Sequence, residues 1–299
     1  LKLKKYLKIS NADVIHTNHS HDLWVLTPAL RRSGSKAKLF LTKHMASGVK
    51  KTDIVHSYLY NRLNGIFAIS NFISESVLKT CPVPNEKVHL LPVGIDMKKF
   101  SKENFSKDDI KAEMQIPGGK LIIGIMGRMT PGKGHEEFLE AAKKINETHK
   151  DKVFFLVVGS ASYGEEEYGS KIKNYSRELN IENILFTGYT DDAPKMLAAM
   201  DILAFPSHDE SFGRVLLEAM AMEIPQAASG NSGVLDIAVD NETGILFEPK
   251  NSALLAKALK RLIESEELRA KMGKASKKRA EEVFSFDIMT AKLMSFYNK

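Results

Sequence analysis

The sequence contains a single cysteine, Cys81, among 299 residues. One cysteine excludes an internal disulfide framework and any zinc site built from several cysteines, and it favours a reducing, cytoplasmic compartment. No apolar run reaches the roughly 20 residues that a membrane-spanning helix needs. The basic start, LKLKKYLK at 1–8, lacks the apolar segment and the small-residue cleavage site of a secretory signal peptide. These absences favour an ordinary globular protein of the cytoplasm.

The formal net charge is +6 and the pI is about 9.1. A basic balance favours anionic partners, such as nucleotides, phosphorylated substrates or acidic lipid surfaces. The lysines are spread along the whole chain, without an arginine-rich arm, interleaved aromatics or a nucleic-acid motif. We therefore expect no nucleic acid, and we include peripheral contact with the cytoplasmic face of a membrane among the partners.

From residue 120 onward, apolar runs alternate with amphipathic segments. The runs predict strands at 121–125, 153–158, 183–187, 201–205, 225–229 and 244–247. The segments between them predict helices at 136–145, 168–179, 193–199 and 211–222. Continuous apolar strands that alternate with helices are typical of a parallel sheet covered on both faces. This half is predicted to be a doubly wound α/β domain.

The first hundred residues repeat this pattern with fewer strands. Strands are predicted at 13–16, 38–42 and 65–69, and helices at 24–31 and 72–79. Three or four strands are few for such a domain, so we expect its first βαβ unit to be absent. The polar stretch 101–107 is the predicted linker. Three further helices are predicted at the end of the chain, at 252–263, 267–283 and 288–298.

Two glutamates, Glu210 and Glu218, stand eight positions apart around a Ser-Phe-Gly turn. If one helix carries both, they lie roughly 12 Å apart along it and within about 80° around it. The unpaired backbone N–H groups at its start, at Phe212, Gly213 and Arg214, would suit a phosphate or a sugar hydroxyl. The spacing alone is also typical of surface glutamates that complement a helix dipole.

A glycine-rich turn, GRMTPGKG at 127–134, follows the strand at 121–125. Such a turn gathers backbone N–H groups at a helix start, and Arg128 and Lys133 add two cations, so it predicts a diphosphate site. The P-loop pattern GxxxxGK[ST] fails here because Gly134 replaces the hydroxyl residue that holds Mg²⁺. An NTPase is therefore the weaker alternative.

Taken in order, these motifs resemble the GT-B retaining glycosyltransferases of family 4, which transfer a sugar from a nucleotide-sugar to an acceptor. The resemblance covers nearly the whole chain. Its other markers are DVIH at 13–16, FAIS at 67–70, PVGID at 92–96 with Phe100, FTG at 186–188, PS at 206–207 and NETG at 241–244. The resemblance implies two Rossmann-like domains that face a cleft, the first of them incomplete here. It implies an N-terminal domain at 1–103, a donor-binding domain at 104–283 and a helix at 284–299 that packs back on the first domain.

The resemblance also implies roles for individual residues. Arg128 and Lys133 neutralise the departing diphosphate, Glu210 faces the donor sugar, Glu218 holds the ribose and His44 reaches the donor sugar from the first domain. Further donor-binding positions are implied at Gly127, Gly188, Ser211, Phe212, Gly213, Arg214 and Val215, and an acceptor-side position at His16. No cofactor or metal is expected. The implied donor is a UDP- or GDP-sugar, and the implied acceptor is a glycolipid or saccharide of lipid-linked or surface polysaccharide synthesis.

Several features depart from this pattern. The family ends its next loop with Gly-Gly-x-Pro-Glu, whereas Ser232, Leu235 and Asp236 replace three of these residues. We also expect the sequence to begin after the usual first strand and glycine-rich loop. A catalytically impaired nucleotide-sugar-binding protein is therefore one alternative, and an epimerase of related fold is another. A metal held by His16, His19, His21 and Asp22 is a further, weaker alternative.

Overall fold

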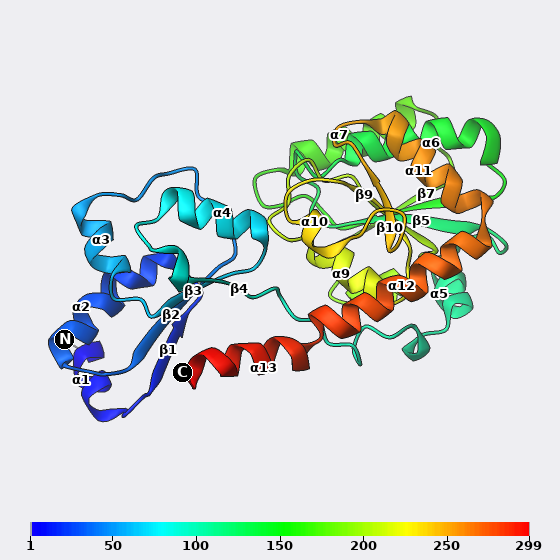
Figure 1. The fold of residues 1–299 in the computed structure, drawn as a ribbon. Helices are drawn as coiled ribbons and strands as arrows, with labels where there is room; N and C mark the ends of the chain where they lie inside the picture. Colours follow the sequence, from blue (N-terminus) through cyan, green and yellow to red (C-terminus); the bar gives the residue numbers. More distant parts are fainter. Residues whose placement is uncertain (1, 299) are drawn as a thin grey trace. The chain divides into compact units, whose positions relative to one another are not determined.

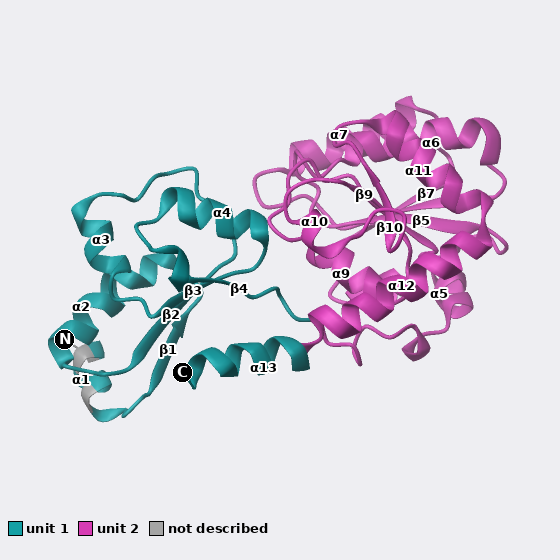
Figure 2. Cartoon of the chain, in the orientation of Figure 1, with its two compact units in different colours: residues 1–94, 287–299 teal, residues 95–286 magenta. Residues whose placement is uncertain are grey.

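The computed structural model describes residues 2–298 and divides the chain into two compact units (Figure 1). The described parts of 1–94 and 287–299 form unit 1, and residues 95–286 form unit 2 (Figure 2). Both units are built on a parallel sheet, as the alternation of strands and helices predicts.

Unit 1 holds a four-stranded sheet with the order β1-β2-β3-β4. Its strands are β1 Val14–Thr17, β2 Lys38–Lys43, β3 Gly65–Ala68 and β4 Val88–Leu90. Its helices are α1 Lys2–Ile9, α2 Leu23–Ser33, α3 Ile54–Tyr60, α4 Asn71–Thr80 and α13 Phe286–Tyr297. The predicted strands and helices are confirmed to within a few residues, whereas α1 and α3 were not predicted because they are short and lack a long apolar stripe.

Helix α13 is the last element of the chain, yet it packs on the sheet of unit 1. Leu293, Phe296 and Tyr297 cover buried Phe40 and Phe67. The Phe296 ring lies 5.2 Å from that of Phe67 and 4.4 Å from that of His89, measured between centroids. Apolar burial of this kind stabilises by roughly 25 cal/mol per Å² of surface removed from water.

Unit 2 holds a six-stranded sheet with the order β10-β9-β8-β5-β6-β7. Its strands are β5 Leu121–Met126, β6 Val153–Val158, β7 Ile184–Gly188, β8 Ile202–Phe205, β9 Gln226–Ser229 and β10 Gly244–Phe247. All are parallel, and their side chains form the large apolar core of the unit. All six were predicted from their apolar runs.

The helices of unit 2 lie on both faces of this sheet, with α6, α7 and α11 on one side and α9 and α12 on the other (Figure 1). They are α5 Lys107–Glu113, α6 His135–His149, α7 Glu166–Glu178, α8 Ala193–Ala198, α9 Arg214–Ala221, α10 Val234–Ile237, α11 Ser252–Glu264 and α12 Glu266–Phe284. Side chains cap several starts: Ser106, Asn251 and Ser265 accept from backbone N–H groups of the first turn.

The boundaries of the two units differ from the predicted domain boundaries, which lie after residues 103 and 283. Ile95 N–H donates to the Phe284 carbonyl at 2.8 Å, and Phe286 N–H donates to the Ile95 carbonyl at 3.1 Å. This bridge ties residue 95 to the end of α12, so unit 2 begins at Ile95 and runs to Phe286. The predicted linker 101–107 is likewise a part of unit 2, because Lys102 pairs with Glu223 and Ser106 caps α5.

Within residues 2–298, no helix combines the length and the apolar character that crossing a membrane requires.

Candidate functional site

The strand order of unit 2 reverses between β5 and β8, which are neighbours in the sheet although five elements separate them along the chain. Ligands of open α/β sheets bind at such a switch point, beside the carboxyl ends of the strands. The loop 127–134 follows β5, and the loop 206–213 follows β8. The two predicted motifs are therefore brought together by the topology of the sheet.

The two loops are in direct contact. His208 N–H donates to the Gly132 carbonyl at 2.8 Å. Gly134 has φ +78°, and a Cβ built on it would lie 2.2 Å from the Pro206 carbonyl oxygen. Only glycine satisfies both the left-handed backbone and this close approach. The glycines of the loop thus serve the packing of one loop on the other as well as the exposure of backbone N–H groups.

The two cations of the glycine-rich loop differ in their surroundings. Lys133 Nζ lies 2.6 Å from Glu210 Oε2, with side-chain exposures of 30% and 19%. Arg128 is exposed and forms no ion pair with any described residue. The loop therefore offers one cation that is already neutralised by Glu210 and one that is available to an anion.

Helix α9 corrects the predicted geometry of the glutamate pair. It begins at Arg214, because Gly213 has φ +99° and acts as a left-handed N-cap. Glu210 lies in the preceding loop, so the two carboxylates do not share one helix and the spacing expected for a shared helix does not apply. Phe212 is buried and packs on Phe284 with ring centroids 6.1 Å apart.

The backbone N–H groups at the start of α9 are also displaced from the predicted ones. The amides of 214–216 are the ones that lack partners within the helix, since Leu217 N–H already donates to the Gly213 carbonyl. No acidic residue lies in the first turn to compete with an anion. Ser211 lies beside this turn, where its carbonyl packs closely against Gly233.

Glu218 is buried in α9, with a relative exposure of 5%. It accepts a hydrogen bond from Arg214 Nε at 3.0 Å. Burial raises the pKa of Glu218, and the charges of Arg214 and then Lys99 act in the opposite direction. A partly desolvated carboxylate with a single cationic partner is poised to accept further hydrogen bonds from a ligand.

A cavity of about 380 Å³ lies beside these groups. Gly127, Arg128 and Val215, all predicted donor-binding positions, line it together with Gly159 and Tyr189. Gly188 adjoins this wall, since its carbonyl accepts from Gly159 N–H at 2.9 Å. The volume and the mixed lining are typical of a small-molecule site.

Three residues of this region were not predicted. His208 Nε2 lies 2.7 Å from Glu137 Oε1, which ties the loop before α9 to helix α6. His135 is 2% exposed, its ring nitrogens have no partner among the described residues, and burial lowers its pKa to about 4. The only sequence signal was the place of these residues next to the motifs.

The predicted histidines of unit 1 have defined partners. His16 Nε2 lies 2.6 Å from Thr42 Oγ1, and His16 Nδ1 is bonded to the Tyr297 hydroxyl. His44 Nε2 lies 3.1 Å from Asn18 Oδ1. Burial lowers the pKa of both histidines. His16 thus has a structural role in holding α13, whereas one ring nitrogen of His44 remains for a ligand.

Among the described residues, no three or more His, Cys, Asp and Glu side chains gather in a way that could hold a metal ion. Asp22, the predicted carboxylate of the histidine cluster, instead accepts from the Thr17 hydroxyl.

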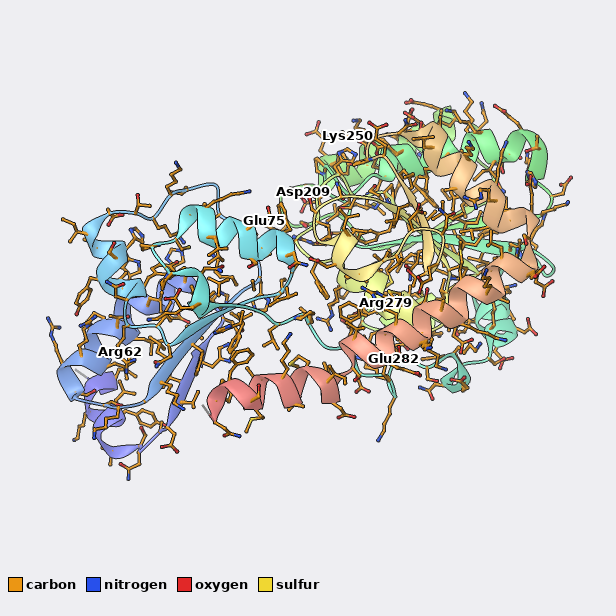
Figure 3. The ribbon with its side chains drawn as sticks, viewed as in Figure 1. Arg62, Glu75, Asp209, Lys250, Arg279 and Glu282 are labelled. Carbon is orange, nitrogen blue, oxygen red and sulfur yellow. The ribbon has the colours of Figure 1, made fainter. Side chains whose placement is uncertain are left out.

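The departures from the motif lie at the start of α10, with Ser232 in the loop before it and Leu235 and Asp236 within it. Ser232 has φ +46°, and its hydroxyl donates to Asp209 Oδ1 at 2.6 Å. Asp209, which is labelled in Figure 3, lies in the loop before α9. Leu235 is 57% exposed. The carbonyl of Asp236 accepts from Arg279 of α12 at 2.9 Å. Ser232 therefore joins two loops of the site, and the other two replacements are accommodated without a break in the fold.

Comparison with known proteins agrees with this arrangement. The family described as "Glycosyl transferases group 1" matches residues 106–279, and "Glycosyltransferase Family 4" matches residues 1–99. A glycosyltransferase structure from Rickettsia africae superposes with a TM-score of 0.88 at 25% identity, over 99% of this chain and 79% of that one.

Curated relatives are similar in sequence. The capsular polysaccharide biosynthesis glycosyltransferase CapM of Staphylococcus aureus is 29% identical over 78% of this chain, which spans 61% of the length of CapM. The UDP-Gal:alpha-D-GlcNAc-diphosphoundecaprenol alpha-1,3-galactosyltransferase of Escherichia coli is 26% identical over 90% of this chain and 70% of its own length. With two Rossmann-like units of GT-B type and a group 1 match across most of unit 2, this chain belongs to the group 1 family of glycosyl transferases.

Proposed function

We propose that the chain transfers a sugar from a UDP-sugar to a saccharide or glycolipid acceptor, with retention of the anomeric configuration. The observation that carries the proposal is the Lys133–Glu210 pair at the switch point of unit 2, in the same glycine-rich loop as Arg128, which lines a cavity at the start of α9. Two cations, helix amides and a carboxylate form a complementary site for a diphosphate that bears a sugar.

The proposed roles follow the direction of the donor. Glu218 accepts from the ribose hydroxyls, and the cavity beside Tyr189 and Gly188 takes the base. Arg128, Lys133 and the amides of 214–216 bind the diphosphate. Glu210 faces the sugar. The charge that develops on the leaving diphosphate is stabilised by the two side-chain cations, so the reaction requires no metal.

In the proposed reaction, the bond from the anomeric carbon to the diphosphate oxygen breaks, and a bond from the acceptor oxygen to that carbon forms on the same face. The acceptor proton passes to an oxygen of the leaving diphosphate. We assign no covalent sugar–enzyme intermediate, because no carboxylate of the described donor site is an evident second nucleophile. Glu210 stabilises the developing positive charge on the sugar.

The choice of donor and acceptor rests on the relatives. The name of the Escherichia coli relative specifies UDP-galactose and an acceptor linked to a lipid by a diphosphate, and CapM is named for capsular polysaccharide synthesis. We propose the same classes here, and we retain a GDP-sugar as the second donor. The net charge of +6 supports peripheral contact with an anionic membrane on its cytoplasmic side.

The test measures nucleotide release from UDP-glucose, UDP-galactose, UDP-N-acetylglucosamine and GDP-mannose, each with and without saccharide acceptors. The anomeric proton signal of the product reports retention or inversion. Glu210→Ala is expected to abolish transfer while the protein remains folded. Binding of a donor without any release would favour the non-enzymatic alternative, and interconversion of nucleotide-sugars without an acceptor would favour an epimerase. Activity that survives chelation of metals is also expected.

A further inference from the structure

Unit 1 contains a second pair of cations, Lys43 and Lys51, that the donor site does not use. Lys43 is the last residue of β2, and Lys51 lies in the loop that follows. Both side chains belong to half-buried residues. Neither ammonium lies within ion-pair distance of a carboxylate among residues 2–298 whose side chains are described.

Two hydroxyl groups bring these lysines into one cluster. Lys43 Nζ donates to Ser20 Oγ at 3.2 Å, and Lys51 Nζ donates to the Tyr60 hydroxyl at 3.4 Å. Ser20 and the Cys81 thiol both affect the ionisation of the Tyr60 phenol, whose pKa is raised mainly by burial. Lys43, Ser20, Tyr60 and Lys51 are therefore neighbours, and we name them the Lys43–Lys51 cluster.

The cluster is held in place by the fold. Ser20 follows β1, and Lys43 ends β2, so both lie at the carboxyl end of the sheet of unit 1. Tyr60 is only 2% exposed. The loop that carries Lys51 is fixed by a hydrogen bond from Lys51 N–H to the Thr80 carbonyl at 2.7 Å. The two ammonium groups are thus positioned by strands and buried contacts.

The charged side chains nearest Lys43 and His44 are cationic, and the Cys81 thiol is the one group that acts in the opposite direction. Burial lowers the pKa of Lys43, and Lys51 lowers it further, whereas the Cys81 thiol raises it. His44 adjoins Lys43, and the charges of both His19 and Lys43 lower the pKa of His44. Two like charges that are partly removed from water, without a counter-charge, are unfavourable unless an anion joins them.

We propose that the Lys43–Lys51 cluster binds the phosphate of an anionic acceptor, and this inference rests on the proposed function. Each ammonium has three N–H donors and spends one of them on a hydroxyl, so two remain on each lysine. Lysine binds phosphate as a point charge, which suits two ammoniums and two hydroxyls around one phosphoryl group. The acceptor class is a saccharide carrying a phosphate or a diphosphate.

The experiment uses the full chain with Arg128→Ala and Lys133→Ala, so that the proposed diphosphate site of unit 2 does not compete. Calorimetric titration with inorganic pyrophosphate and with inorganic phosphate compares this protein with one that also carries Lys43→Met and Lys51→Met. Pyrophosphate affinity is expected to fall by about tenfold or more, the cost of losing charged hydrogen bonds. Tighter binding of pyrophosphate than of phosphate indicates a diphosphate acceptor, and equal binding indicates a monophosphate.

The matched control is Lys50→Met, which replaces an exposed lysine next to Lys51. It is expected to leave pyrophosphate affinity unchanged. If the protein with Lys43→Met does not fold, the single replacement Lys51→Gln is used instead, because Lys51 lies in a loop. It should also weaken pyrophosphate binding. Equal pyrophosphate affinity with and without the lysines would overturn the proposal. A separate titration of the unsubstituted chain with UDP tests the proposed function, and its failure is distinguishable because UDP contacts unit 2.

Discussion

Lys133 Nζ and Glu210 Oε2 lie 2.6 Å apart and join the loop after β5 to the loop after β8. The proposed diphosphate ligand and the carboxylate therefore compete for one ammonium, or share it. Because both side chains are less than one-third exposed, the pair is more than a solvated surface contact. The Lys133 ammonium is held in place by Glu210 without a ligand. Less side-chain entropy is therefore lost when a ligand binds to it.

Replacing this cation tests its proposed role in leaving-group stabilisation. Lys133→Met is expected to lower the rate of UDP release by roughly 10²–10³-fold, as for the loss of one group that stabilises developing charge. Single-turnover release of UDP from the active donor measures this effect. Lys143→Met, an exposed lysine of α6, is the matched control. An unchanged rate in Lys133→Met would remove Lys133 from the mechanism.

The Glu137–His208 pair is predicted to position Glu210 without contacting the donor. His208 is held at its ring by Glu137, at its N–H by the Gly132 carbonyl and at its carbonyl by Asn231. His208→Gln should loosen the loop that carries Glu210, and the proposed role of Glu210 is to contact the sugar and not the UDP. The affinity for the UDP-sugar should therefore fall severalfold, with little change for UDP itself.

Calorimetry with UDP and with the UDP-sugar separates these effects for His208→Gln. Glu137→Gln should have the same effect, and Glu147→Gln on the exposed side of α6 is the control. Equal losses of affinity for UDP and for the UDP-sugar would mean that the pair supports the whole site rather than Glu210.

Much of unit 2 was predictable because its strands are uninterrupted apolar runs. The segments 153–158 and 244–247 were predicted with the bounds that the structure has. Such runs are buried on both faces of a parallel sheet, so their local composition determines their state. The glycine-rich loop was predictable for a similar reason, since its backbone conformation requires glycine.

The pairing of side chains was not predictable, because it depends on tertiary contacts. Lys133 and Glu210 meet only since β5 and β8 are adjacent in the sheet. The start of α9 was predicted at residue 211 and lies at Arg214, because Gly213 adopts a left-handed backbone. The Lys43–Lys51 cluster likewise depends on Ser20 and Tyr60, which no local pattern connects to either lysine.

Glu218 should limit stability and support nucleotide binding. Burial raises its pKa above the ordinary 4.5, so the folded state binds this proton more tightly than the unfolded chain does. The free energy of unfolding therefore falls as the pH rises through the window that begins at 4.5 and ends at the raised pKa. Glu218→Gln removes this penalty, and it should melt at a higher temperature than the unsubstituted chain at neutral pH but not at acid pH.

The same variant should bind UDP about tenfold more weakly, because an amide offers one acceptor where the carboxylate offers two. Thermal unfolding followed by circular dichroism measures the first effect and calorimetry the second. Glu242→Gln, an exposed glutamate, is the control. If Glu218 holds the ribose, 2′-deoxy-UDP should bind the unsubstituted chain and Glu218→Gln with equal affinity. If Glu218→Gln still binds UDP more tightly than 2′-deoxy-UDP, by the same factor as the unsubstituted chain, Glu218 does not hold the ribose.

His135 should make unit 2 sensitive to acid. Burial lowers its pKa to about 4 from 6.5, so the unfolded chain takes up a proton between these values and the folded unit does not. Stability is therefore complete above the unfolded value and is lost as the pH falls from 6.5 toward 4. His135→Leu removes both the titration and two unpaired ring nitrogens. It should be more stable than the unsubstituted chain, by a margin that widens as the pH falls.

Urea unfolding followed by circular dichroism between pH 7 and pH 4.5 tests this prediction. The slope of stability against pH that belongs to this one group should reach at most about 1.4 kcal/mol per pH unit. Trp24, the single tryptophan, lies in unit 1, so its fluorescence provides an internal control that should not change. Equal pH slopes in both proteins would show that His135 does not titrate on unfolding.

Helix α13 should be essential for the stability of unit 1. Phe296 packs on Phe67 and His89, so Phe296→Ala exposes the sheet face that α13 covers. The expected loss is about 2 kcal/mol or more, somewhat below that for a fully buried phenylalanine. Trp24 fluorescence during urea unfolding reports this loss, because Trp24 lies on α2 of unit 1. Met294→Ala, a neighbour on α13 that is 45% exposed, should leave the midpoint nearly unchanged. Equal urea midpoints for Phe296→Ala and Met294→Ala would mean that the contacts of α13 do not stabilise unit 1.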